Sequence, residues 1–319
     1  LYTYNDVAKP ARLVDKHVSA FFSSNTRYVK KSKEGYVASG NNNCGELGVD
    51  IRDANHCTHI MPSVSKSIII QAIACGRGHS LFLSRSGTVH SCGLNISGQC
   101  GMGNSGYERI TIPQHITGLI NIKDIAAGND LSAAIDQDNA LYTWGGNHRG
   151  MLGHGVMENN YSVSVPTVIH TITAKHIAIA ATGTVGAINS KNRVFTWGQN
   201  TQGLLGNPSF ETRYEPTVVP ALANTPCTRI DAGIHTMSVV TQSGELYMWG
   251  GNASKQIEMS DDTEISTPKK ISIYPEIFSR FIERLKSRQA ANEVIDQVLN
   301  GVHVTTQENA TAQLKTLSL

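Results

Sequence analysis

Trp144-Gly145-Gly146-Asn147-His148-Arg149-Gly150-Met151-Leu152-Gly153 is one of five copies of a single glycine-containing segment in this chain. The other copies begin at Ser39, Cys92, Trp197 and Trp249, and each keeps an asparagine three residues after its first position. The first glycines of the copies are 53, 52, 53 and 52 residues apart: Gly40, Gly93, Gly145, Gly198 and Gly250. A period this constant indicates one structural unit that is repeated and stacked.

A second marker, proline, recurs in phase with the glycine segments. Six prolines follow one another at steps of 50 to 53 residues: Pro10, Pro62, Pro113, Pro166, Pro216 and Pro268. A proline at the first residue of a strand removes no ladder hydrogen bond. We therefore expect each of these prolines at the entrance of a strand.

The residues that precede each glycine segment have the pattern of a β-hairpin. Residues 125–135 are rich in Ile and Ala, Asp138-Asn139 is a turn signal, and Leu141-Tyr142-Thr143 follows. Residues 73–83 and 230–240 are similar. Two β-rich runs with a Gly or Asn turn between them are typical of a hairpin.

These markers predict the fold. A unit of about 52 residues with four strands leaves roughly 13 residues for each strand and its loop, as in short antiparallel sheets. Four-stranded sheets repeated radially make a β-propeller. Residues 1–274 therefore predict an all-β propeller of five units, about five blades. We expect the ring to close where Pro268–Tyr274, the start of a sixth unit, pairs beside the N-terminal strands.

The composite pattern Ala-X-Gly-X-X-His-Ser/Thr, followed by Trp-Gly-X-Asn-X-X-Gly-X-Leu-Gly, resembles the RCC1 repeat, named for the regulator of chromosome condensation. The resemblance covers about residues 10 to 271. Kelch repeats, of similar length and with a Gly-Gly pair, are the alternative. Gly145-Gly146 and Gly250-Gly251 fit a kelch repeat, whereas Gly93-Leu94 and Gly198-Gln199 do not. The pattern favours an RCC1-like β-propeller.

The chain departs from that family in three respects. The family's usual ring has about seven blades, within the usual range for propellers, whereas five full units are present here. Units one and four have Ser23–Thr26 and Ala181–Thr184 in place of the Gly-X-X-His run. The fifth loop has Lys255 and Glu258 where the other copies have glycine.

Composition excludes several classes of function. With 27 Lys and Arg against 25 Asp and Glu, the net charge of +2 gives no electrostatic case for nucleic acid. No apolar run reaches the roughly 18 residues of a transmembrane helix, and we find no signal peptide. The six cysteines lack metal or disulfide spacing, and Cys75 stands in the place of Ala127. We therefore expect reduced thiols, an intracellular location (cytoplasmic or nuclear), and a monomer.

Motifs for chemistry are scarce. The nucleophile, phosphate-loop and zinc-protease motifs are absent from the sequence. Asn55–His59 gathers three possible metal ligands, but no second cluster completes a site. We expect no catalytic residue, no metal site and no cofactor.

The candidate site lies in the turn before the hairpin. Equivalent residues of successive blades return to one face of a propeller and surround the mouth of its channel. Here that ring holds Asn25, Arg77, His79, Asn129, Asp130, Thr182, Thr184, Ile234 and His235. We predict that a protein partner binds this face through Arg77, His79, Asn129, Asp130, Thr184 and His235.

The resemblance implies a partner for this face, since RCC1-like proteins engage a small GTPase there with acidic and histidine residues. Asp130, His79 and His235 are the matches in this sequence. The alternative is that His79 and His235 hydrogen-bond to backbone groups between blades. One hypothesis is therefore guanine-nucleotide exchange on a Ran-type GTPase, although the spacing leaves no room for the inserted wedge of family exchange factors. The other is a scaffold without exchange activity.

The last part of the chain changes character. Residues 275–302 predict an amphipathic helical segment, with an apolar stripe that includes Ile277, Phe281 and Leu285 and basic residues on the other side. It either docks on the propeller or contacts a membrane surface or a partner. Residues 303–319 are polar, and we expect them to be disordered.

Overall fold

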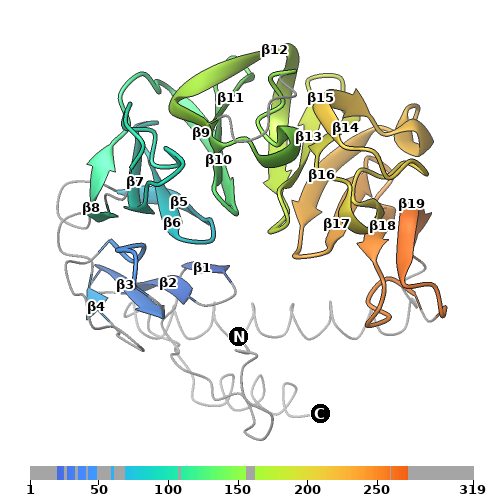
Figure 1. The fold of residues 1–319 in the computed structure, drawn as a ribbon, viewed down its shortest axis with the longest axis horizontal. Helices are drawn as coiled ribbons and strands as arrows, with labels where there is room; N and C mark the ends of the chain where they lie inside the picture. Colours follow the sequence, from blue (N-terminus) through green and yellow to red (C-terminus); the bar gives the residue numbers. More distant parts are fainter. Residues whose placement is uncertain are drawn as a thin grey trace, which may run out of the picture. The chain divides into compact units, whose positions relative to one another are not determined.

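The structure is a computed structural model that describes residues 20–24, 27–32, 35–40, 42–48, 59–60, 69–106, 109–155, 162–258 and 260–271. Asn25, the first two in-phase prolines, residues 55–58 and the two predicted C-terminal segments lie outside these ranges. The described residues form strands joined by loops and by the short 3-10 helices η1 (His148–Gly150), η2 (Thr201–Gly203) and η3 (Pro220–Leu222) (Figure 1).

The strands form antiparallel units of four, which we call blades I to V. Blade I contains β1 (Ala20–Ser24), β2 (Arg27–Ser32), β3 (Gly35–Gly40) and β4 (His59–Ile60). Blade II contains β5 (Ile70–Cys75), β6 (His79–Ser84), β7 (Val89–Leu94) and β8 (Arg109–His115). Blade III begins with β9 (Ile122–Gly128), β10 (Leu131–Asp136) and β11 (Ala140–Gly146), and blade IV ends with β13 (Thr184–Asn189), β14 (Val194–Gly198) and β15 (Arg213–Val218). Blade V contains β16 (Cys227–Ala232), β17 (Thr236–Thr241), β18 (Leu246–Gly251) and β19 (Glu264–Lys270).

One strand belongs to two blades. The 18-residue strand β12 (Ser162–Ile179) pairs with β11 as far as Thr173, and with β13 from Ala174 onward. It is therefore the outermost strand of blade III and the first strand of blade IV (Figure 1). The prediction of an all-β propeller built from about five repeated units is confirmed.

The predicted position of the prolines is wrong. Pro113, Pro166, Pro216 and Pro268 lie inside β8, β12, β15 and β19, so each is in the outermost strand of a blade instead of at the entrance of the next unit. An outermost strand pairs on one side only, so a residue without an N–H group is tolerated in its interior. The periodicity gave the spacing of the prolines but not their place in the repeat.

Of the segment predicted to close the ring, residues 268–270 belong to blade V, and residues 272–274 and 1–19 lie outside the described residues. Residues Glu264–Lys270 form β19, which pairs with β18 from Tyr247↔Lys270 to Gly251↔Glu264. This segment therefore completes blade V. It uses its ladder hydrogen bonds inside its own sheet.

The repeated asparagine holds each glycine loop together. Its side-chain Oδ1 accepts a hydrogen bond from the backbone N–H five residues later, at 2.8 to 3.0 Å, in all five copies: Asn42 from Leu47, Asn95 from Cys100, Asn147 from Leu152, Asn200 from Leu205 and Asn252 from Ile257. These asparagines are buried. A buried side-chain oxygen that satisfies a loop N–H fixes the loop conformation.

The loops of blades II, III and IV also contact the next blade through tryptophan side chains. The indole Nε1 of Trp249 in blade V donates to the carbonyl of Leu204 in the loop of blade IV at 2.8 Å. Trp197 and Trp144 donate in the same way to the loops of blades III and II. All three tryptophans are fully buried. The loop of one blade is therefore part of its interface with the following blade.

The seventh residue of the ten-residue segment, Gly203 in blade IV, shows why the loop needs glycine there. Gly203 has φ +72, and a Cβ there would lie 2.5 Å from Cα of Ser266 in β19 of the next blade. The equivalent glycines meet the outermost strand of the following blade at 2.6 to 2.9 Å from a Cα atom: Gly45 at Thr111, Gly98 at Ser164 and Gly150 at Tyr214. Backbone touches backbone at these four points, which leaves no space for a side chain.

Blade V differs. Lys255, with φ +55, occupies the position of Gly203, and Glu258 occupies that of Gly206. Lys255 is exposed and forms an ion pair with Asp261 at 3.0 Å, and Glu258 pairs with Lys269 of β19. The fifth loop keeps the internal asparagine bond but has charged side chains at the positions that contact a following blade in the other copies.

Candidate functional site

A cavity of about 560 Å³ lies where the first strands of blades II to V end. It is lined by Ile73, Ala74, Cys75, Gly76, Arg77, Ala127, Gly128, Asn129, Ile179, Ala181, Ala232, Gly233 and Ile234. These residues come from β5, β9, β12 and β16 and from the turns that follow those strands. The turns therefore form one shared rim.

The rim brings together three of the residues that the sequence placed at the channel mouth. Arg77, Asn129 and Ile234 each follow the small residue that ends or succeeds the first strand of their blade. The small residues of the four turns are Gly76, Gly128, Ala181 and Gly233, and all four line the same cavity. Equivalent positions of successive blades thus converge, as expected for a propeller.

Hydrogen bonds between neighbouring blades fix this rim. The backbone N–H of Arg77 donates to the carbonyl of Asn129 at 2.9 Å, which joins blades II and III. The N–H of Ala181 donates to the carbonyl of Gly233 at 3.4 Å, which joins blades IV and V. Asn129 has φ +48, a left-handed conformation that asparagine tolerates better than most residues. The rim is held by backbone contacts that do not depend on the identity of its exposed side chains.

Asp130 and His235 occupy one equivalent position, next to the rim residues. Asp130 is half-buried, and its Oδ1 accepts a hydrogen bond of 3.3 Å from Nε2 of Gln99 in the loop of blade II. His235 is exposed. Both backbone carbonyls accept from the glycine loop of their own blade, Asp130 from Gly146 at 2.9 Å and His235 from Gly251 at 2.6 Å.

His79 and Thr184 have no solvent-exposed side chain. Both are 0% exposed. Nε2 of His79 is 2.8 Å from Oγ of Ser132 in the next blade, and Oγ1 of Thr184 donates to the carbonyl of Gln199 at 2.5 Å. For His79 this agrees with the alternative of a contact between blades, although its partner is a hydroxyl group instead of the backbone. We leave both residues out of the surface proposed below.

The sequence alone does not identify Cys75 as part of this cavity. Its place in the repeat favours a packing substitute for Ala127, yet its half-buried thiol lines the cavity. A signal is present, because Cys75 directly precedes the glycine of the turn. Ile73 and Ile179 carry no such signal, since they follow the apolar alternation of ordinary strand residues.

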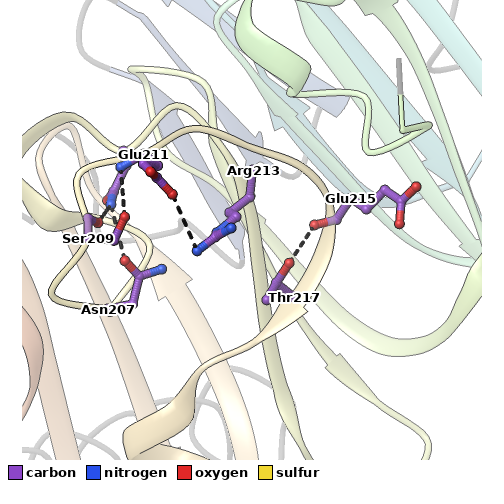
Figure 2. Close-up of polar contacts among 7 residues, drawn as sticks. Asn207, Ser209, Glu211, Arg213, Glu215 and Thr217 are labelled. Atoms are coloured by element: carbon purple, nitrogen blue, oxygen red, sulfur yellow. Dashed lines mark hydrogen bonds and ion pairs between the residues drawn. The ribbon is translucent and has the colours of Figure 1, made fainter. Parts of the chain in front are cut away.

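The loop between β14 and β15, which is not part of the cavity lining, exposes a large apolar side chain. Phe210 is 55% exposed. Figure 2 shows Glu211 directed toward the guanidinium of Arg213, an ion pair of 3.9 Å, while the side chain of Glu215 points away from it. Nδ2 of Asn200 donates to the carbonyl of Ser209 and so ties this loop to the glycine segment of the same blade.

The cavity lining contains one charged side chain among its described residues. Among the thirteen described residues that line it, Arg77 has the one charged side chain, and it is exposed.

Two cysteines outside the cavity are buried, and burial raises the pKa of the Cys100 thiol to about 12 and that of Cys227 to about 11. Within the described part of the chain, no helix is long and apolar enough to cross a membrane.

The same repeat architecture occurs in known proteins. A family model described as the RCC1-like domain matches residues 33–291. A human protein named RCC1-like G exchanging factor-like protein is 29% identical over 243 residues, which cover 70% of this chain and 50% of that protein. The ultraviolet-B receptor UVR8 of Arabidopsis thaliana is 31% identical over 209 residues, which cover 64% of this chain and 46% of the receptor. The chain thus spans about half the length of these curated relatives.

Two solved structures share the fold. Human WBSCR16 superimposes with a TM-score of 0.70 at 23% identity, over 83% of this chain and 70% of that protein. Prp20p of Saccharomyces cerevisiae, whose structure was described together with its binding to Gsp1p and histones, has a TM-score of 0.67 at 22% identity, over 81% of this chain and 64% of Prp20p. At these identities the likeness concerns the fold.

Proposed function

This chain belongs to the RCC1-like family, and we propose that it binds a Ran-type small GTPase through the face that carries Arg77, Asn129, Asp130 and His235, and promotes the exchange of its guanine nucleotide. The match of the family model to residues 33–291 supports this proposal most directly. The names of the human relative and of Prp20p's partner point in the same direction.

Exchange of this kind needs no acid–base residue on the propeller. A protein that binds the nucleotide-free GTPase more tightly than the nucleotide-bound form weakens nucleotide binding by the same factor, because linkage is reciprocal. Binding is tighter when the surface that the partner contacts is already ordered, because no free energy is then spent on ordering it. The rim offers such a surface, because backbone hydrogen bonds join blade II to blade III and blade IV to blade V at the turns.

A second function, a scaffold that binds a protein partner without accelerating exchange, is favoured by one observation. The glycine segments keep steps of 52 and 53 residues throughout, so these five units contain no long insertion. Exchange factors that resemble this family have such a wedge. The same face would serve in both cases, and the two functions differ in their effect on nucleotide release.

Release of a fluorescent GDP analogue from a panel of purified small GTPases separates the two functions. Under the exchange proposal the wild-type protein accelerates release from at least one GTPase, and Asp130→Asn with His235→Gln removes most of that acceleration. Asp138→Asn is the matched control, because Asp138 is exposed in the hairpin turn at the opposite end of β10. Binding without acceleration would leave the scaffold, and equal activity of the double variant and the wild type would refute the assignment of this face.

A further inference from the structure

We propose that the cavity at the blade turns binds an apolar peptide segment that carries a carboxylate, with the carboxylate at Arg77 and an aliphatic or aromatic side chain against Ile179 and Ile234. The inference deepens the proposed function, on which it rests for the source of the segment, a partner protein. It specifies what chemistry that partner must present.

Comparison of the repeats within the chain separates positions that keep a small residue from positions that vary. The small residue of the turn is Gly76, Gly128, Ala181 or Gly233, because the chain packs closely there. A Cβ on Gly128, for example, would lie 2.5 Å from Cγ2 of Ile179. The following position differs among blades II to V: it is Arg77, Asn129, Thr182 or Ile234, and all of these except Thr182 line the cavity. An asymmetric set of side chains around one cavity suits an asymmetric ligand.

Arg77 determines the charge of that ligand. It is exposed, and it provides the one charged side chain among the described residues of the lining. A guanidinium group offers a planar set of donors that matches a carboxylate in a two-bond arrangement.

The remaining lining determines the apolar part. Ile234 is 44% exposed at the rim, a large apolar side chain that a ligand would cover. Ile73 and Ile179 are each 9% exposed and form apolar walls below it. A cavity of about 560 Å³ lies in the usual range for small-ligand sites, about 300 to 1,000 Å³. It can therefore hold two or three peptide side chains.

The buried His79 acts as a positioning residue for Arg77. A Cβ on Gly76 would lie 2.2 Å from Cε1 of His79, so the turn lies directly on the imidazole ring. His79 is in turn held by Ser132 of the next blade, whose Oγ donates to the carbonyl of Gln99 at 2.7 Å. The backbone of Arg77 is therefore fixed from below by His79 and laterally by Asn129.

The thiol of Cys75 provides the assay. We would measure its alkylation by N-ethylmaleimide by peptide mass spectrometry, with the half-buried Cys44 of the first glycine loop as an internal control outside the cavity. The probe is a pool of acetylated and amidated tripeptides with Asp or Glu at the centre and Leu, Ile, Val or Phe at both ends. The matched pool has Asn or Gln at the centre. We expect the acidic pool, at about twice its dissociation constant or above, to slow alkylation of Cys75 about threefold or more, and to leave Cys44 unchanged.

Two variants complete the test. Arg77→Gln should raise the peptide concentration needed for half-maximal protection about tenfold, since it replaces a charge-assisted hydrogen bond by a neutral one. Arg149→Gln is the control, because Arg149 is an exposed arginine of a glycine loop and Gln202 occupies the equivalent position with the same left-handed backbone. Equal protection by both pools, no protection by either pool, or full protection in Arg77→Gln would each overturn the proposal.

The failure of this inference is distinguishable from the failure of the proposed function. If the acidic pool protects Cys75 in a way that depends on Arg77 but no GTPase of the panel binds, the peptide site is supported and the proposed GTPase function is refuted. Binding of a GTPase that neither protects Cys75 nor depends on Arg77 keeps the proposed function and removes the peptide site.

Discussion

Substitution of Gly203 by alanine tests the interface between blades IV and V. The new Cβ would lie 2.5 Å from Cα and 2.7 Å from Cβ of Ser266, and the backbone of Gly203 has φ +72. A left-handed conformation costs a non-glycine residue roughly 1–2 kcal/mol. Forcing an extra carbon into a filled site adds about 1–3 kcal/mol. We expect the free energy of unfolding to fall by about 2–5 kcal/mol.

Gly244→Ala isolates the first of these two effects, the backbone strain. Gly244 lies in the hairpin turn between β17 and β18 with φ +83, and a Cβ added there would have no other atom within 4 Å. This variant should therefore lose only the roughly 1–2 kcal/mol of backbone strain. The steric contribution of the interface is the difference between the two variants.

Urea unfolding followed by tryptophan fluorescence measures both variants. Trp249 is a suitable reporter, because its indole donates to the carbonyl of Leu204, the residue after Gly203. Hydrogen exchange of β19 is a second readout, and it should accelerate in Gly203→Ala before that of the other blades. If the two variants lose the same free energy, the assignment of this loop as a contact between blades is refuted.

Three further outcomes are expected. Asn200→Ala removes the acceptor for the N–H of Leu205 and leaves a buried donor unsatisfied, so thermal or urea unfolding should show a loss of about 1–3 kcal/mol, and an unchanged stability would contradict the loop description. Burial, and in the case of His90 also the charge of His115, lowers the pKa values of His90 and His154 below 6.5 in the folded state. The unfolded chain then binds protons more readily, so the stability contributed by these histidines is complete above pH 6.5 and is lost as the pH falls from there through the folded pKa values; His90→Gln should flatten this acid limb in unfolding measured against pH. Cys100 and Cys227, whose thiol pKa values are about 12 and about 11, should resist alkylation near neutral pH in the native protein and react after unfolding, as mass spectrometry can show.

Repeat arithmetic predicted the fold because the repeated residues act through short-range geometry. The asparagine and the glycines of each loop meet local hydrogen-bond and steric demands, so their spacing directly reports the spacing of the blades. The period of a repeat, however, does not show where within a blade each repeated residue lies. It could not show that Pro216 belongs to the last strand of blade IV, or that residues 264–270 complete blade V.

The candidate site was predictable to the extent that it follows the repeat. Arg77, Asn129 and Ile234 converge because they hold one repeat position on successive blades. His79 was misleading, since a polar residue near a predicted surface is also what a buried contact between blades requires. Cys75 looked like core because a cysteine in place of alanine is a common packing change. Access to the cavity depends on how neighbouring blades pack, which no single repeat encodes.

Lys255 and Glu258 distinguish the loop of blade V from the loops of the other four blades. Four loops accept a neighbour by bringing bare backbone against its outermost strand, and the fifth has a charged side chain at that point of contact. Strand β17 of blade V also has a less covered face than the equivalent strand β10 of blade III. Thr236, Ser238 and Val240 of β17 are partly exposed, whereas Leu131, Ala133 and Ile135 of β10 are fully buried. Among the described residues, the loop at 255–258 thus lacks the glycines through which the other four loops contact a following blade. An engineer who wished to lengthen the protein by one repeat would first have to restore glycine at both positions.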